Sequence, residues 1–254
     1  MKKILILYFS GVGATKKIAE LIHLKLSQNC TVDIFSIEDK NIPTIDTYDA
    51  LIVGTPVHHA APAKALLHYF EMLPKLATKL PAFLYCTRAM TSLHTNRILS
   101  QKLKSKNITT ILDKEYRSPA SDGSIIAPFI KRFFEFEKNL DTKINTDCLN
   151  FLELLNTNKM QDYTPRLRFG SILNAPNKLA GQRTTLKIYL HKDKCIKCDC
   201  CMKQCPHFSF SIDNLGYPLH HSKNCVNCYR CIHHCPKTAL SLSKRRTPRK
   251  LLHY

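Results

Sequence analysis

The sequence has no tryptophan, only 7 glycines and few acidic side chains. Its 19 Asp and Glu residues are outnumbered by 38 Lys and Arg residues, so the formal net charge is +19 at pH 7. No acidic residue occurs from Tyr163 to Lys192. Such a charge favours anionic partners, namely acidic proteins, nucleic acids or membrane surfaces. Hydrophobic residues still make up 44% of the chain, which excludes an intrinsically disordered protein.

Long apolar runs are also absent. The start, MKKILILYFSGVGATKK, resembles a signal peptide, but its apolar run covers only residues 4–9 and charge returns at Lys16. No run approaches the roughly 20 apolar residues that a membrane-spanning helix needs. The closely spaced cysteines described below suit a reducing compartment when they serve as ligands, so we expect a cytoplasmic protein.

The first part of the chain alternates strand-like and helix-like segments. Continuous or alternating apolar runs predict strands at 2–9, 31–37, 49–56, 81–87 and 108–113. Helical periodicity predicts helices at 14–28, 62–72, 93–106, 126–134 and 142–157. This order predicts an α/β fold with a five-stranded, doubly wound parallel sheet. Ligands of such sheets bind beyond the carboxyl ends of the strands.

Composition divides the chain into four segments. We expect the α/β domain at 1–162, a basic linker or arm at 163–187, a small cysteine-rich α+β domain at 188–243 and a basic tail at 244–254. Residues 163–254 carry a net charge of +14, most of the total. The charged runs are expected to be solvated faces or a docking surface for an acidic redox partner. A nucleic-acid or membrane surface is a weaker alternative, since nucleic-acid modules usually add aromatic residues for stacking.

Two cysteine blocks, CIKCDCCMKQCP from Cys195 and CVNCYRCIHHCP from Cys225, form an internal repeat offset by 30 residues. Each contains the pattern C-x2-C-x2-C-x3-C-P. Structural zinc sites typically use separated C-x2-C pairs, and disulfides require an oxidising compartment, so zinc and disulfides are the weaker alternatives. The pattern resembles the cluster-binding run of bacterial ferredoxins, which predicts two 4Fe–4S clusters.

In two-cluster ferredoxins the last cysteine of each run binds the other cluster. The resemblance therefore implies one cluster held by Cys195, Cys198, Cys201 and Cys235, and a second held by Cys225, Cys228, Cys231 and Cys205. Cys200 has no place in this scheme. It is expected to be a buried thiol, with an alternative ligand or a redox-reactive thiol as the other interpretations. The remaining cysteines, Cys30, Cys86 and Cys148, fall in strand or helix patterns and are expected in the core.

The glycine-containing stretch YFSGVGATKK leaves the first strand and enters a helix. Backbone N–H groups at such a helix start can bind a phosphate, and the helix dipole assists. The spacing of its glycines matches neither a Walker A loop nor a dinucleotide fingerprint. By themselves, the glycines are therefore weak support for a nucleotide site.

The same loop resembles the FMN-phosphate loop of flavodoxins, and VGTPVHHAAPAKALLHYFEMLP resembles their second loop. With the cysteine blocks, nearly the whole chain resembles bacterial fusions of a flavodoxin-like domain with a two-cluster ferredoxin. The resemblance implies FMN binding and electron transfer. The residues implied to bind FMN are Ser10, Gly11, Val12, Gly13, Ala14, Thr15, Thr55, Pro56, Val57, His58, Thr87 and Arg88.

This sequence departs from the flavodoxin pattern in each loop. Val12 and Ala14 replace a hydroxyl and an amide that would bind the phosphate, and Thr87–Ser92 lacks the usual glycines and aromatic residue. His58 is expected either to stack on the flavin or to pack against protein. Arg88 is expected either to pair with a phosphate or flavin carbonyl or to lie at the surface. A flavodoxin-like domain that has lost FMN is therefore a second hypothesis.

Three functions follow from these patterns. The first is an electron carrier that links FMN to the two clusters and an external partner. The second is a ferredoxin relay whose flavodoxin-like domain serves only as a docking module. The third is an oxidoreductase with its own small substrate above the flavin. No catalytic acid or base stands out, so no catalytic residue is predicted.

Overall fold

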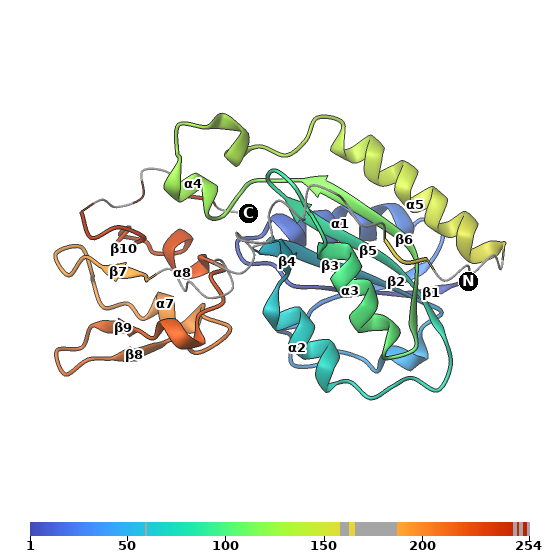
Figure 1. Ribbon diagram of the computed structural model, residues 1–254, viewed down its shortest axis with the longest axis horizontal. Coiled ribbons are helices and arrows are strands. Elements are labelled where there is room, and N and C mark those ends of the chain that lie inside the picture. Colours follow the sequence, from blue (N-terminus) through green and yellow to red (C-terminus); the bar gives the residue numbers. More distant parts are fainter. Residues whose placement is uncertain (59, 158–162, 166–186, 246–247, 249–250, 253–254) are drawn as a thin grey trace.

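The computed structural model describes residues 1–58, 60–157, 163–165, 187–245, 248 and 251–252. A parallel sheet forms the centre of the first part (Figure 1). Its strand order is β2-β1-β3-β5-β6, with β1 at Lys3–Tyr8, β2 at Thr31–Ser36, β3 at Ala50–His58, β5 at Leu80–Arg88 and β6 at Ile108–Arg117. The predicted five parallel strands are confirmed. A short strand not predicted, β4 (Ala61–Pro62), pairs antiparallel with the end of β3.

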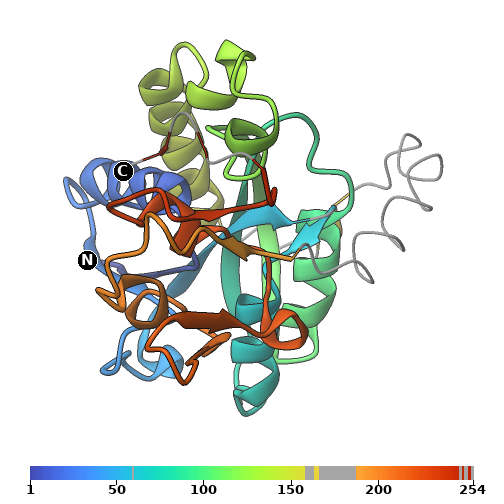
Figure 2. The ribbon, with the colours of Figure 1, turned by 90° about the vertical axis from the view of Figure 1, so that its left-hand side faces the viewer.

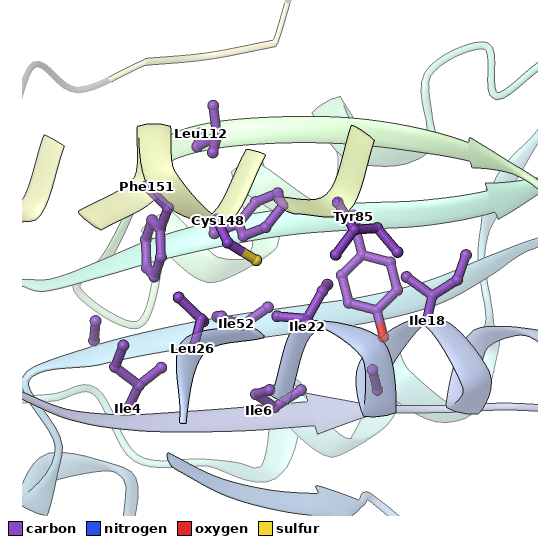
Figure 3. Packing of buried hydrophobic residues seen from close by; sticks show 14 of the residues in the cluster. Ile4, Ile6, Ile18, Ile22, Leu26, Ile52, Tyr85, Leu112, Cys148 and Phe151 are labelled. Atoms are coloured by element: carbon purple, nitrogen blue, oxygen red, sulfur yellow. The ribbon is translucent and has the colours of Figure 1, made fainter. Parts of the chain in front are cut away.

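Helices cover both faces of the sheet because the buried strands are apolar on both sides. In β1, Ile4 and Ile6 pack under α1 (Ala14–Leu26) and α5 (Leu140–Asn156), as the close view in Figure 3 shows. The alternating residues Leu5 and Leu7 join the opposite core, with residues of α2 (Lys64–Met72), α3 (Thr95–Lys104) and the short η1 (Ile45–Thr47). The continuous apolar run of the sequence therefore serves two cores.

The helix predicted at 126–134 is wrong. The chain forms α4 (Gly123–Ile126) and, separately, the 3-10 helix η2 (Lys131–Phe134). Pro128 lies between them, and Ala127 before it has φ −130° and ψ 66°, outside the helical region. Proline disfavours a helical residue before it and lacks an N–H to donate. The apolar pattern also does not mark one buried face, since Phe129 is 84% exposed.

Residues 187–245 form a small unit with two antiparallel strand pairs. Strand β7 (Tyr189–Leu190) pairs antiparallel with β10 (Leu240–Ser241), and β8 (Phe210–Ile212) pairs antiparallel with β9 (Pro218–His220). Two short helices, α7 (Cys200–Lys203) and α8 (Arg230–His233), and η4 (Ser222–Asn224) complete it. Its small core includes Ile188, Ile232 and Leu240. Figure 2 shows this cysteine-rich unit in front of the edge where the parallel strands end.

Most of the arm predicted at 163–187 lies outside the described residues. Tyr163 donates its backbone N–H to the carbonyl of Thr110 on β6. Of the predicted basic tail, Leu252 is described and is 2% exposed. In the described part of the chain, no helix is both long enough and apolar enough to cross a membrane.

One buried aromatic residue and one exposed aliphatic residue of α5 provide a test of how this helix packs. Phe151 is fully buried and its ring lies 5.5 Å from that of Phe83 on β5, whereas Leu149 is 57% exposed. We expect Phe151→Ala to lower the free energy of unfolding by about 3–5 kcal/mol, because it leaves a cavity. The control Leu149→Ala should change it by about 0.5 kcal/mol or less. Urea unfolding of both variants measures this, and equal losses would contradict the assigned helix face.

Candidate functional site

A pocket lies at the carboxyl edge of the parallel sheet. It collects residues from the ends of β1, β3, β5 and β6, although these are far apart in sequence. Nine residues that were predicted to bind FMN line it, namely Ser10, Gly11, Val12, Ala14, Thr15, Pro56, Val57, His58 and Thr87. The three loops predicted to converge therefore meet at one place, as expected for a doubly wound sheet.

The loop after β1 has the geometry of a turn into a helix. Gly13 has φ 96°, a left-handed conformation that favours glycine, and α1 begins at the next residue. The N–H of Gly13 donates to Ser10 Oγ at 3.1 Å, which closes the turn. Because α1 is 13 residues long, its N-terminus adds a favourable dipole for an anion in the pocket.

Two threonine hydroxyls form a hydrogen bond with each other in the wall of the pocket. Thr15 Oγ1 and Thr87 Oγ1 are 2.8 Å apart, and both residues are buried. The carbonyl of Thr15 accepts a hydrogen bond from the buried hydroxyl of Tyr85 at 3.1 Å. This network links the start of α1 to β5 and holds the hydroxyls at the pocket.

Three of the predicted FMN residues do not line the pocket. Gly13 forms the turn just described. Thr55 is fully buried and stabilises the start of α2, since its Oγ1 accepts the N–H of Ala63 at 3.0 Å. Arg88 turns toward the neighbouring strand, where its Nε donates to Glu115 at 2.8 Å. The partner of Arg88 lies 27 residues away on β6, and nothing local in the sequence indicated it.

A fourth loop, after β6, also lines the pocket through Ser118–Asp122. The residues predicted to bind FMN follow only the first, third and fourth predicted strands. The stretch SPASDG at 118–123 carries the turn residues of a loop, and this signal was missed. The loop is anchored by His233 of the cysteine-rich unit, whose Nε2 lies 2.8 Å from the carbonyl of Ser121. The other ring nitrogen, Nδ1, accepts the N–H of Leu252 at 3.0 Å.

The eight cysteines predicted as ligands line two separate cavities. One cavity is lined by Cys195, Cys198, Cys201 and Cys235, and the other by Cys205, Cys225, Cys228 and Cys231. We refer to them as the first and the second cysteine cavity. Each contains three cysteines of one block and the last cysteine of the other, which is the crossed grouping predicted from the sequence. The remaining walls are largely apolar, with Ile196 and Leu240 in the first and Ile188 and Val226 in the second.

The sequence repeat is also a repeat of backbone geometry. Left-handed residues occur at Lys197, Asp199 and Phe208, and again 30 residues later at Asn227, Tyr229 and Thr238. The N–H of Ser209 donates to Cys205 Sγ at 3.2 Å, and that of Ala239 donates to Cys235 Sγ at 3.2 Å. Such hydrogen bonds stabilise thiolates and tune the clusters that thiolates hold.

The two cavities differ in burial. Two cysteines of the second cavity, Cys228 and Cys231, are buried, whereas in the first cavity only Cys201 is buried and Cys198 is exposed. Burial raises the pKa of the Cys228 thiol to about 11 and that of the Cys201 thiol to about 12. A buried thiolate needs compensating positive charge, which iron would supply on coordination. The donor set therefore fits a metal cluster. In the described residues, no three His, Cys, Asp or Glu side chains lie close enough to bind one shared metal ion. A 4Fe–4S cluster does not require this, because each of its four thiolates would bind a different iron.

Cys200 lines the first cavity, and its thiol donates to the carbonyl of His234 at 3.3 Å. The cysteines expected in the core, Cys30, Cys86 and Cys148, are all buried. Burial raises the pKa of the Cys148 thiol to about 12. These three lie in the α/β part, outside both cavities.

The second cavity adjoins the pocket. A Cβ atom placed on Gly11 would lie 2.9 Å from the carbonyl oxygen of Cys228 and 3.3 Å from its Cβ. Cys228 also belongs to the core cluster of the sheet, together with Leu7 and Phe9. The loop after β1 is therefore in backbone contact with the loop that carries the predicted ligand Cys228.

Comparison with known proteins gives one family match. The model of the family described as "Flavodoxin domain" matches residues 5–134. A search of the curated proteins found no match. Similar solved structures include two-electron reduced Megasphaera elsdenii flavodoxin, with 14% identity, a TM-score of 0.44, and coverage of 58% of this chain and 98% of that one. A flavoprotein from Lactobacillus acidophilus in complex with FMN has 18% identity, a TM-score of 0.38, and coverage of 52% and 100%.

The contact at Gly11 leads to a test. In Gly11→Ala the new methyl group would meet backbone atoms of Cys228, which cannot rotate away as a flexible side chain can. We expect this variant to separate the two loops and to lower the melting temperature by about 2 °C or more, the effect of a loss of roughly 1–3 kcal/mol. Thermal unfolding followed by circular dichroism measures the change. An unchanged melting temperature would contradict the close contact.

Proposed function

Since the chain belongs to the flavodoxin domain family, we propose that it transfers electrons between FMN, two 4Fe–4S clusters and an external redox partner. One observation carries this proposal. Each predicted set of four cysteines lines one cavity, and the second cavity is in contact with the phosphate loop of the candidate FMN pocket. Two kinds of redox site would thus lie side by side in one chain.

FMN, when bound, would supply the conversion between two-electron and one-electron transfer. The chain would hold its phosphate with the N–H groups of the loop at 10–15 and with the hydroxyls of Thr15 and Thr87. Val57 and His58 line the same pocket and are the side chains available to the flavin ring. The loop at 118–122 would exclude water from one side of the pocket.

The two cysteine cavities would hold the clusters, each of which passes one electron at a time. The thiolates of each set of four would bind the irons, and the N–H groups of Ser209 and Ala239 would stabilise Cys205 and Cys235. Apolar residues around both cavities would limit water access and thereby tune the reduction potentials.

The positions of the two cavities favour one order of electron-transfer sites. The second cavity adjoins the FMN pocket through Gly11, whereas the first reaches solvent at the exposed Cys198. Electrons would therefore pass between FMN and the second cluster inside the chain, and between the first cluster and the partner at the surface. Because residues 163–254 carry a net charge of +14, the partner is expected to be acidic.

A specific observation favours the second candidate function, a ferredoxin relay with a flavin-free docking domain. The pocket at the sheet edge has a volume of about 60 Å³, while small-molecule sites usually measure ~300–1,000 Å³. FMN would have to displace part of the loops that close the pocket. An oxidoreductase with its own small substrate would need still more room, so we do not favour it.

Iron analysis with two neighbouring cysteine variants tests the clusters. We expect about eight irons and eight sulfides per chain in anaerobically purified protein. Cys198→Ser removes a predicted ligand and should lower the iron content by about half. The control Cys200→Ser alters a cysteine without a predicted ligand role and should retain the full content. Zinc without sulfide would contradict the prediction of 4Fe–4S clusters. Iron loss in Cys200→Ser but not in Cys198→Ser would assign the ligand role to Cys200 and not to Cys198.

Flavin titration with two buried threonines tests the pocket. Thr15→Val removes a hydroxyl at the pocket wall. The control Thr110→Val removes a hydroxyl of β6 outside the pocket, which donates to Ser100 Oγ on α3 at 2.9 Å. We expect FMN to bind the unaltered protein and Thr15→Val to weaken binding about tenfold, as for a lost hydrogen bond to a charged group. Thr110→Val should leave the affinity unchanged. Quenching of FMN fluorescence measures both, and full iron without FMN binding to the unaltered protein would favour the docking candidate.

A further inference from the structure

We propose that Arg230 is a positioning residue that orients two peptide groups of the phosphate loop toward the flavin phosphate and ties this loop to the second cysteine cavity. The inference deepens the proposed function and rests on it for the identity of the bound phosphate. Arg230 is the first residue of α8 and lies between the predicted ligands Cys228 and Cys231. The flavodoxin pattern does not include it.

The guanidinium group of Arg230 makes hydrogen bonds to both parts of the chain. Its Nε donates to the carbonyl of Gly11 at 2.9 Å, and its Nη2 donates to the carbonyl of Ser10 at 2.6 Å. Nη1 donates to the carbonyl of Gln204 at 3.4 Å, next to the predicted ligand Cys205. One side chain therefore joins the loop after β1 to both blocks of the cysteine repeat.

The contacts of Arg230 with two carbonyls also fix the direction of two backbone N–H groups. A trans peptide is planar, and its N–H points opposite to its C=O. The carbonyls of Ser10 and Gly11 point at Arg230, so the N–H groups of Gly11 and Val12, which belong to the same two peptides, point away from it. Both residues line the FMN pocket. Arg230 thus prepares two donors for a phosphate without touching it.

Glu38 holds the guanidinium in place. Its two carboxylate oxygens accept from Nη2 at 2.7 Å and from Nη1 at 3.0 Å. The side chain of Arg230 is only 14% exposed, and a buried cation without a partner is strongly unfavourable. An arginine guanidinium group stays protonated in proteins. The cation is therefore retained beside the carbonyls.

The internal repeat supports a specific role for this arginine. The position equivalent to Arg230, 30 residues earlier, is Cys200 at the start of α7. The first repeat therefore lacks the arginine, and its exposed Cys198 lies away from the phosphate loop contact that Cys228 makes. The arginine occurs only in the repeat that meets the phosphate loop.

Amide hydrogen exchange and FMN titration of the cluster-loaded chain test this inference. In Arg230→Gln we expect the amides of Gly11 and Val12 to exchange about tenfold faster or more without flavin, and FMN to bind about tenfold more weakly, because charged hydrogen bonds are lost. Arg230→Lys keeps the charge but not the planar fork and should give an intermediate effect. The control Lys203→Gln removes an exposed cation of α7 and should change neither quantity.

The outcomes separate this inference from the proposed function. Unchanged exchange at Gly11 and Val12 in both Arg230 variants, with full iron content, would overturn the positioning role. If the unaltered protein does not bind FMN, the flavin part of the proposed function fails, yet faster exchange in Arg230→Lys would still support the loop contact. Should Arg230→Gln fail to fold, Arg230→Lys and Glu38→Gln give the same readout.

Discussion

The backbone contact between the loop after β1 and the loop of Cys228 constrains both the pocket at the sheet edge and the second cysteine cavity. It is possible because residue 11 has no side chain: an added Cβ would lie 2.9 Å from the carbonyl of Cys228. Arg230 then fills the space beside this contact and binds the carbonyls of Ser10 and Gly11. The pocket at the sheet edge and the second cysteine cavity consequently adjoin each other at this contact, so a shift of one loop would press on the other.

This contact makes the two cysteine cavities unequal although their sequences repeat. Reduction would add negative charge to a cluster in either cavity. In the second cavity burial disfavours that charge, while the neighbouring Arg230 cation favours it. In the first cavity exposure at Cys198 lets water stabilise it. Two clusters with the same ligands would therefore differ in reduction potential.

Local patterns in the sequence predicted much of this arrangement. The apolar run of β1 and the alternation of strands and helices predicted the parallel sheet, and the resemblance of the cysteine blocks to two-cluster ferredoxins predicted the grouping in each cavity. What could not be predicted depends on residues far apart in sequence. Glu38 and Arg230 are separated by 192 positions, and the loop at 118–122 reaches the pocket only because β6 ends beside β5. The helix predicted at 126–134 failed for a local reason, since Pro128 outweighed the apolar periodicity.

A single imidazole ring joins three distant segments. The N–H of Leu252 occupies Nδ1 of His233, so in the neutral ring the proton resides on Nε2, where it can be donated to the carbonyl of Ser121. This tautomer is complementary to both neighbours, a donor on one side and an acceptor on the other. The ring therefore couples the segment at Leu252 and the helix α8 to the rim of the pocket at Ser121, and this coupling depends on which ring nitrogen carries the proton.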